Sequence, residues 1–430
     1  MAHCVLVLLL ATIWAVHAAL PPPLCVNGLV YEDRDECECF TCWSGPACSI
    51  ELSECLLSCE TNEGYVQTDY WTQDALGDPH TDISSSYRTD YMDPQVWHPG
   101  NPDPPPGVFG AIRKQILRVH EMVGNVKDIE SYSMVVAHGA TQMINGAIDA
   151  LSQNQGLRLN VIAPVPYYYL IPGVTRVAKG AAGFLAADEA LSLPPQSLVE
   201  VITSPRNPDG IKNTTTSTST SNVIYDNVFY WPSFTEMEGP LDLPIMVFSL
   251  SKLAGLSGSR LGWAFVKDPA IADAIGDYIY YSTHGVTVDA QYRAANVLKR
   301  IADDRGILLA YVNETLRARW DWVVNAFAEQ AEQHYAIAGT FGFPVLWINC
   351  LDFPGKDGCS VMFAQVGINV RSGGEFGSPG FVRMNMMVHD VTWGQCQERL
   401  QVLLGLTGQT HKRRLASAKQ MSVSYPRYSS

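Results

Sequence analysis

Apolar positions along residues 109–123 recur at the spacing of one helix face, and Gly124 and Asn125 end that pattern. From there to about residue 249, short apolar runs alternate with helical stretches. Residues 133–151 predict a strand, a glycine turn and a helix, and further buried strands are predicted within 160–168, 198–205, 223–226 and 245–249. Strands that alternate with helices predict a parallel sheet covered on both faces. Residues 291–338 are predicted to be largely helical, and 345–406 to form a second, smaller αβ unit.

The N-terminus has the pattern of a secretory signal. Residues 5–16 are apolar, and Val16-His17-Ala18 follows the form of a cleavage site, so 1–19 is predicted to be a signal peptide. The apolar stretch is shorter than the roughly 20 residues that span a bilayer. An uncleaved anchor is the alternative, since no Lys or Arg precedes the stretch. We expect entry into the secretory pathway, with the vacuole or the cell exterior as destination, and no membrane attachment after cleavage.

Seven of the eleven cysteines fall within one short segment that has few large aliphatic residues. They are Cys25, Cys37, Cys39, Cys42, Cys48, Cys55 and Cys59. Such a segment needs cross-links to fold, and the secretory signal favours disulfides over zinc, because no His lies between residues 20 and 60. We assign 20–65 to a disulfide-rich module of EGF-like style. Cys350 and Cys359 flank a turn-rich loop that a further disulfide would close.

The formal net charge of −14 argues against a nucleic-acid partner, which needs a basic face. Basic residues gather instead in the last 20 residues, and we expect 411–430 to be a disordered basic tail, with a sorting signal as the alternative. Asn213 and Asn313 begin N-glycosylation sequons, which matter because the chain is predicted to be secretory.

Four features with chemical potential follow the predicted strands, where ligands bind in parallel sheets. They are the glycine turn at 138–142, the turn 204–210 that carries Asn207, Asp226 at a strand end, and the Gly- and Ser-rich segment 249–263 with Lys252 and Arg260. A helix that opens on a glycine turn offers N–H groups to a phosphate. A lysine in small, hydroxyl-rich surroundings with an arginine eight residues later suits an anionic cofactor.

Together these features resemble the pyridoxal phosphate enzymes of the aspartate aminotransferase type. The segments SPRNPDG, IYDNVFYWP, SLSKLAGLSGSRLGWAFVKD and FVRMN resemble more closely the plant alliinase family, which includes alliin lyases and tryptophan aminotransferase-related proteins. The block CECFTCWSGPAC is similar to the EGF-like module of alliinases. The resemblance implies an α/β fold of type I with a catalytic domain at 66–410, divided into a large subdomain at about 109–290 and a small one at about 291–410 plus the N-terminal arm. It also implies a homodimer.

The resemblance assigns roles to individual residues for pyridoxal 5′-phosphate and an amino acid substrate. Lys252 would form the Schiff base and move the Cα proton, Asp226 would hold the ring nitrogen protonated, and Asn207 would donate to the ring oxygen. Tyr167 would stack on the ring, or else be a core tyrosine, and Arg383 would bind the substrate carboxylate, or else be a surface arginine. The phosphate would be held by Ser249, Ser251, Arg260 and the backbone of Gly139, Ala140 and Thr141. Tyr91 would reach a cofactor across the dimer interface.

The resemblance also implies the disulfides Cys25–Cys37, Cys39–Cys48, Cys42–Cys55 and Cys350–Cys359, and leaves Cys59 and Cys396 unassigned. One departure stands out: Phe229 occupies the position where the family usually has a tyrosine, and Tyr230 is expected to point away. The implied activity is a carbon–sulfur lyase acting on S-alkyl-L-cysteine sulfoxides by α,β-elimination. An aminotransferase acting on an aromatic amino acid such as tryptophan, and a secreted binding protein on a degenerate scaffold, are the alternatives.

Overall fold

A computed structural model describes residues 25–31, 36–39, 42–52, 55, 57–58, 67, 108–186, 190, 192–213, 219–328, 334–351 and 358–405. The chain divides into two compact units, Met1–Ser58 and Cys59–Ser430. The division falls slightly before the boundary predicted at residue 65. The signal segment, the basic tail, Tyr91 and Cys59 lie outside the described residues.

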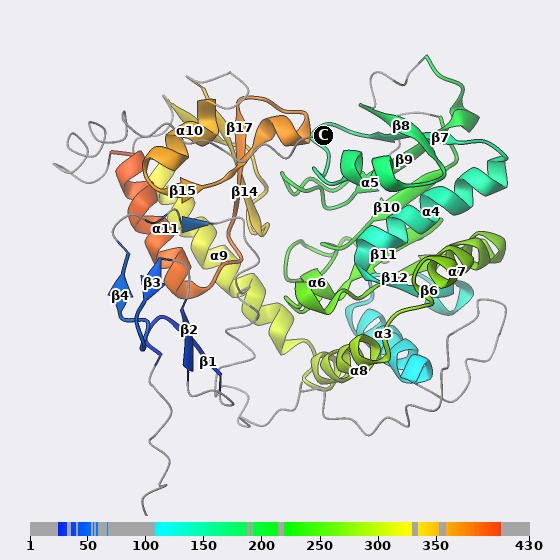
Figure 1. The fold of residues 1–430 in the computed structure, drawn as a ribbon, viewed down its shortest axis with the longest axis horizontal. Helices are drawn as coiled ribbons and strands as arrows, with labels where there is room; N and C mark the ends of the chain where they lie inside the picture. Colours follow the sequence, from blue (N-terminus) through cyan, green and yellow to red (C-terminus); the bar gives the residue numbers. More distant parts are fainter. Residues whose placement is uncertain are drawn as a thin grey trace, which may run out of the picture. The chain divides into compact units, whose positions relative to one another are not determined.

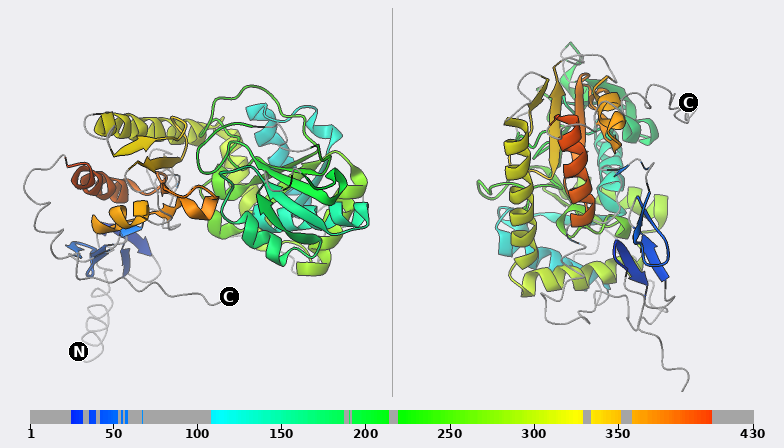
Figure 2. Two further views of the ribbon diagram at one scale, coloured as in Figure 1. Left: turned by 90° about the horizontal axis from the view of Figure 1, so that it is seen from above. Right: turned by 90° about the vertical axis from the view of Figure 1, so that its left-hand side faces the viewer.

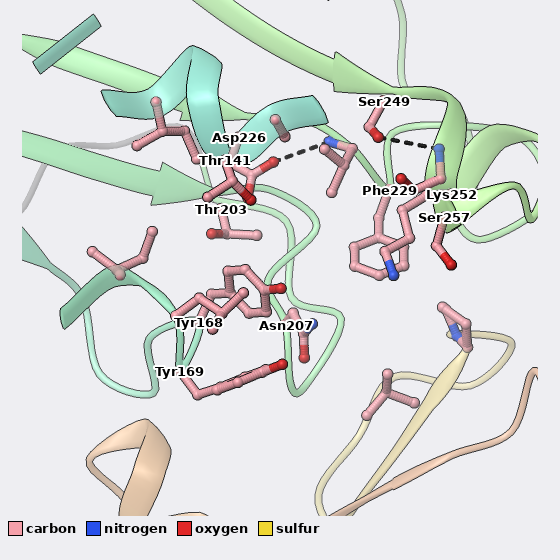
Figure 3. Close-up of a pocket in the computed structure, with 18 of the residues that line it drawn as sticks. Thr141, Tyr168, Tyr169, Thr203, Asn207, Asp226, Phe229, Ser249, Lys252 and Ser257 are labelled. Atoms are coloured by element: carbon pink, nitrogen blue, oxygen red, sulfur yellow. Dashed lines mark hydrogen bonds between the residues drawn. The ribbon is translucent and has the colours of Figure 1, made fainter. Parts of the chain in front are cut away.

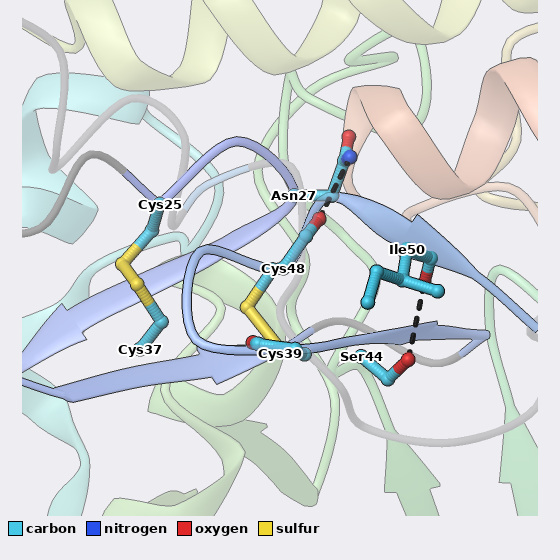
Figure 4. Close-up of a disulfide and its surroundings, with 8 residues drawn as sticks. Cys25, Asn27, Cys37, Cys39, Ser44, Cys48 and Ile50 are labelled. Carbon is cyan, nitrogen blue, oxygen red and sulfur yellow. Dashed lines mark hydrogen bonds between the residues drawn. A yellow bond between two sulfur atoms is a disulfide. The ribbon is translucent and has the colours of Figure 1, made fainter.

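The first unit contains short antiparallel strand pairs held by disulfides (Figure 4). Its strands are β1 (Gly28–Tyr31), β2 (Glu36–Cys39), β3 (Trp43–Ser44), β4 (Ile50–Glu51) and β5 (Leu57–Ser58). Its disulfides are Cys25–Cys37, Cys39–Cys48 and Cys42–Cys55, the three that the resemblance implied. The Asn27 side chain also donates to the Cys48 carbonyl at 3.0 Å. The described part of this unit is therefore stabilised mainly by cross-links, as expected for a short chain without a large core.

The larger unit is built on a seven-stranded sheet (Figure 1). In sheet order its strands are β6 (Ser133–Ala137), β12 (Gly262–Val266), β11 (Ile245–Ser249), β10 (Val223–Asp226), β9 (Leu198–Thr203), β7 (Leu159–Ala163) and β8 (Ala181–Ala186). β12 runs antiparallel to both of its neighbours, and the other neighbouring pairs are parallel. The predicted strands at 133, 160, 198, 223 and 245 are all present, whereas β8 and the antiparallel β12 had not been predicted.

Helices cover both faces of this sheet, which explains why its strands are apolar on both sides. The described helices are α3 (Val108–Val123), α4 (Gly139–Gln155), α5 (Ile171–Val177), α6 (Leu250–Leu253), α7 (Pro269–Thr283), α8 (Val288–Asp303), α9 (Ile307–Ala328), α10 (Gly358–Gln365) and α11 (Asp390–Leu403). Helices α4, α5 and α7 pack on one face around a core that includes Val135, Val201 and Val247. On the other face, His120 of α3 contacts the rings of Phe248 and Phe265.

A four-stranded antiparallel sheet forms the centre of the small subdomain (Figure 2). Its order is β13 (Tyr335–Ile337), β14 (Val345–Cys350), β17 (Phe381–Asn385) and β16 (Arg371–Ser372), and the two-residue strand β15 (Ile368–Asn369) precedes β16. Buried Arg319 of α9 donates to the Met386 and Val388 carbonyls and to Asp390 at the start of α11. These bonds tie the long helix to the segment that follows β17.

Two expectations about this subdomain are refined by the structure. The stretch predicted to be helical to residue 338 ends its helix at Ala328, and Tyr335–Ile337 is the edge strand β13. The disulfide Cys350–Cys359 joins the end of β14 to α10, as the turn-rich loop between them suggested.

Cys396 is buried in α11 and belongs to none of the four disulfides. Among the described helices, none combines the length and the apolar character needed to cross a membrane.

Candidate active site

A cavity of about 460 Å³ opens where the parallel strands of the large sheet end (Figure 3). Strands β9, β10 and β11 end at Thr203, Asp226 and Ser249, and all three side chains line the cavity. The register of the sheet places Asp226 directly beside Thr203, so residues far apart in sequence meet at this edge. The volume is that of a typical site for a small molecule or cofactor.

Asp226 is a buried carboxyl group at the base of this cavity. Burial raises its pKa from 3.8 to about 6, although the Val228 N–H, the charge of Lys252 and the Thr203 side chain each favour the charged form. The Val228 N–H lies 3.4 Å from Asp226 Oδ1. A carboxylate held in this way is only partly compensated, and a cationic ligand group beside it would be stabilised.

Lys252 enters the cavity from α6, the one-turn helix that follows β11. The Ser249 hydroxyl caps this helix by accepting the Ser251 N–H at 3.1 Å. Lys252 Nζ lies 5.5 Å from the centre of the Phe229 ring, within cation–π range. Behind it, the buried Gln67 side chain donates to the Lys252 carbonyl at 3.1 Å and packs against Gly255. The backbone that carries the amine is therefore fixed on both sides.

A concave surface suited to an anion lies at the start of α4. Gly139 has φ +72°, and a Cβ atom there would lie 2.5 Å from Arg260 Nη2. A Cβ atom at Gly262 would similarly lie 2.6 Å from the Gly139 carbonyl carbon. Ala140 and Thr141 line the cavity beside Arg260, so N–H groups of a helix start, a guanidinium and hydroxyls converge. Gly139 provides the close approach between this turn and Arg260.

The opposite wall of the cavity comes from the small subdomain. Buried Arg383 of β17 donates from Nη1 to Asn207 Oδ1 at 3.2 Å, which turns the Asn207 amide so that its oxygen faces the arginine. Arg371 of β16 also lines the cavity. The predicted residues Asn207, Asp226, Ser249, Ser251, Lys252, Arg260 and Arg383 are thus brought together with Ala140 and Thr141.

The structure does not place Tyr167 in this cavity. Its ring packs edge-on against Phe184 at 4.9 Å and against Gly377, where a Cβ atom would lie 2.9 Å from the ring. The two following residues, Tyr168 and Tyr169, line the cavity instead, near Asn207 (Figure 3). Tyr167 is partly buried and packs against the core of the large sheet, so the aromatic wall of this cavity is formed by Tyr168 and Tyr169.

The structure confirms the expected arrangement around Phe229. Its ring lines the cavity next to Lys252, and Tyr230 points elsewhere, donating its hydroxyl to the Gly239 carbonyl at 2.8 Å. This wall therefore presents a ring face to the amine where a tyrosine would present a hydroxyl.

The cavity is also lined by residues that the sequence pattern did not single out, among them Thr203, Tyr168, Tyr169 and Arg371. Thr203 ends a strand that is buried throughout, so its position at the strand end was the available signal. Arg371 lies in a two-residue strand without hydrophobic periodicity.

Asn313 is placed in a way that its sequon did not suggest. It lies within α9, and its Nδ2 donates to the Pro232 carbonyl at 3.0 Å and to the Ser233 carbonyl at 3.4 Å. Because the Asn313 amide nitrogen donates to backbone carbonyls, we expect Asn313 not to carry a glycan. Asn213 remains a predicted site.

Comparison with known proteins places this chain in a family. The family model described as Allinase matches residues 110–404, which covers more than half of the chain. The chain belongs to the alliinase family. Alliin lyase 2 of Allium sativum is 28% identical over 391 residues, covering 84% of this chain and 80% of that protein. Tryptophan aminotransferase-related protein 1 of Oryza sativa subsp. japonica is 30% identical over 319 residues, covering 67% and 71%. An aspartate aminotransferase structure from Thermus thermophilus, solved with maleate, matches with a TM-score of 0.59 at 17% identity, covering 81% of this chain and 92% of that one.

This alliinase-family protein therefore has the type I fold, and its cofactor is pyridoxal phosphate. The cavity fits that group by its own chemistry. The buried Asp226 carboxylate suits a protonated ring nitrogen. Hydroxyls, the Arg260 guanidinium and the start of α4 line the same cavity and suit a phosphate, and the Lys252 amine lines it as well. The protein is a pyridoxal phosphate enzyme.

Proposed function

We propose that this enzyme is a carbon–sulfur lyase that cleaves S-alkyl-L-cysteine sulfoxides to a sulfenic acid, pyruvate and ammonia. The observation that carries the proposal is the match to alliin lyase 2 over most of both chains, together with the disulfide-linked module ahead of the catalytic unit. The disulfides also require an oxidising compartment, which supports a secretory route to the vacuole or the cell exterior.

The predicted cofactor-binding residues have these proposed roles in the reaction. Ser249, Ser251, Arg260 and the backbone at 139–141 would hold the phosphate, Asp226 would keep the ring nitrogen protonated, and Asn207 would donate to the ring oxygen. Tyr168 is proposed as the stacking residue in place of Tyr167. When bound, pyridoxal phosphate acts as an electron sink for a carbanion at the substrate Cα.

The substrate would be held by its carboxylate and deprotonated by a neighbouring amine. Arg383 is the buried guanidinium of the small-subdomain wall, and a planar fork of N–H donors matches a carboxylate. The Lys252 amine, which lines the same cavity, would accept the Cα proton. Loss of that proton and cleavage of the Cβ–S bond release the sulfur group as a sulfenic acid and leave an unsaturated amino acid, which tautomerises and takes up water to yield pyruvate and ammonia.

Transamination of an aromatic amino acid is the second candidate, because tryptophan aminotransferase-related protein 1 is similarly related. Both reactions begin with the same proton removal and differ in whether a leaving group departs from Cβ. A homodimer, in which Tyr91 would reach the partner's site, is proposed with either reaction.

The experiment that separates the candidates uses purified protein with added pyridoxal phosphate. One reaction contains S-methyl-L-cysteine sulfoxide, and the other contains tryptophan with a 2-oxo acid. We expect pyruvate and ammonia from the first, absent in Lys252→Ala and retained in Lys299→Ala, a control at a half-exposed surface lysine of α8. Amino-group transfer without pyruvate would exclude the lyase. Absence of protein-bound cofactor absorbance, after unbound pyridoxal phosphate has been removed by gel filtration, would instead favour a binding protein.

A further inference from the structure

Arg371 is a cation of this cavity to which neither the phosphate nor the substrate carboxylate has been assigned. Its guanidinium Cζ lies over the Tyr169 ring, 3.9 Å from the ring centre, which is a cation–π contact. Its side chain is about one quarter exposed, and it lines the same cavity as Lys252 and Asp226. The residue is therefore held in place on a wall that a ligand would contact.

Arg371 faces the cavity beside Arg383. The two residues lie directly opposite each other on β16 and β17, and opposite residues of antiparallel strands project from the same face. Arg383 Cζ lies 5.6 Å from the same Tyr169 ring. Two like charges this close repel each other. Their pairing is tolerated because the Tyr169 ring lies against both and because Glu375 binds Arg371 Nη1 at 2.8 Å.

The arrangement indicates the kind of group that Arg371 would bind. An amino acid has one α-carboxylate, which Arg383 accounts for, so a second guanidinium requires a second acceptor on the substrate side chain. A second carboxylate would compete with Glu375, which already compensates the charge of Arg371. A sulfoxide oxygen is strongly polarised but carries no net charge, so it accepts a hydrogen bond without displacing Glu375.

We infer that Arg371 is a specificity-determining residue that donates a hydrogen bond to the S-oxide oxygen of the substrate. This inference rests on the proposed lyase function and names the part of the substrate that Arg371 recognises. In the elimination, the Cα–H bond breaks as Lys252 takes the proton, and the Cα electron pair forms the Cα–Cβ double bond. The Cβ–S bond breaks, and its electron pair leaves with sulfur as a sulfenate, which is then protonated. Negative charge thus grows on the oxygen that Arg371 contacts, so the bond strengthens during the reaction.

The test compares two substrates that both yield pyruvate. S-methyl-L-cysteine sulfoxide has the acceptor oxygen, whereas β-chloro-L-alanine has a good leaving group and no acceptor. We expect Arg371→Met to lower kcat/KM for the sulfoxide by about 10- to 100-fold more than for β-chloro-L-alanine, the effect of losing a charge-assisted hydrogen bond. Arg371→Lys, which keeps the charge but not the planar fork, should fall between the wild type and Arg371→Met.

The matched control is Arg317→Met, which removes an arginine that also packs over an aromatic ring, at 5.7 Å from Phe341, outside the cavity. It should leave the ratio of the two substrates unchanged. Near-ultraviolet circular dichroism and cofactor absorbance establish that each variant is folded and loaded. Equal losses on both substrates in Arg371→Met, or no loss on the sulfoxide, would overturn the assignment while leaving the lyase proposal intact. A wild type that releases pyruvate from β-chloro-L-alanine but not from the sulfoxide would overturn both.

Discussion

Replacement of Asp226 by Asn should stabilise the cofactor-free protein while impairing cofactor binding. Asp226 is buried, and burial raises its pKa from 3.8 to about 6. Below pH 3.8 the carboxyl group is neutral in both the folded and the unfolded chain. As the pH rises from 3.8 to about 6, the unfolded chain releases its proton first, so stability falls across this window and stays low above it.

The shift of roughly two pKa units corresponds to about 3 kcal/mol at pH 7, at 1.36 kcal/mol per unit. Asn has nearly the same shape and no charge, so Asp226→Asn should be more stable than the wild type by up to about 3 kcal/mol at pH 7 and nearly equal to it at pH 4. Thr203→Val removes a group that favours the charged carboxylate, so it should further destabilise the cofactor-free protein at pH 7.

Urea unfolding of the cofactor-free proteins at pH 4, 5, 6 and 7 measures these differences. Added pyridoxal phosphate should then reverse the order, because a charged Asp226 would stabilise the protonated ring nitrogen proposed to lie beside it and Asn would not. A stability difference between wild type and Asp226→Asn that is the same at pH 4 and pH 7 would show that the penalty does not come from ionisation of Asp226. A cofactor effect of equal size in both proteins would refute the assignment of Asp226 to the ring nitrogen.

Burial lowers the pKa of His120 from 6.5 to about 3, so stability should fall as the pH drops below 6.5, by about 2 kcal/mol at pH 5, and His120→Gln should flatten this slope in urea unfolding between pH 5 and 7. If the pH dependence of stability is the same in His120→Gln as in the wild type, that dependence comes from other groups. Arg383→Lys should raise KM for the amino acid by about 10- to 100-fold with little change in cofactor absorbance, because the planar fork is lost. An unchanged KM in Arg383→Lys would show that Arg383 does not bind the substrate carboxylate. Mass spectrometry of secreted protein should find a glycan on Asn213 and none on Asn313, whose Nδ2 donates to backbone carbonyls, and a glycan on Asn313 would contradict the role of that amide.

The strand-end residues could be predicted from the sequence because two regularities coincide there. Buried strands are recognisable in a sequence as apolar runs, and the carboxyl ends of parallel strands lie at the same edge of the sheet. Asp226 ends such a run and Lys252 lies three residues after another, so their meeting did not depend on details of side-chain packing.

Features set by local turns and by neighbouring elements could not be predicted in the same way. Three tyrosines follow one another at 167–169, and which of them faces the cavity is decided by packing against Phe184 and Gly377. β12 runs antiparallel to β11 because the chain turns back after the short segment that carries Lys252. The pattern of apolar residues in the sequence does not reveal the direction of a strand. Arg371 reaches the cavity only because its two-residue strand pairs with β17, a contact between residues that no local pattern predicts.

The electrostatics of the cavity connect stability to recognition. Among the described residues that line it, four are cationic (Lys252, Arg260, Arg371 and Arg383), and Asp226 is the acidic one. Such an excess of positive charge destabilises the folded chain unless ligands or nearby acids compensate it. Phosphate and an α-carboxylate would compensate Arg260 and Arg383, whereas Arg371 already has Glu375 within the protein. Because Arg371 is compensated before any ligand arrives, it can bind a neutral oxygen without requiring a further negative charge. A substrate with one carboxylate and one polarised, uncharged oxygen matches this distribution, whereas a dicarboxylic amino acid would leave Glu375 facing a second anion.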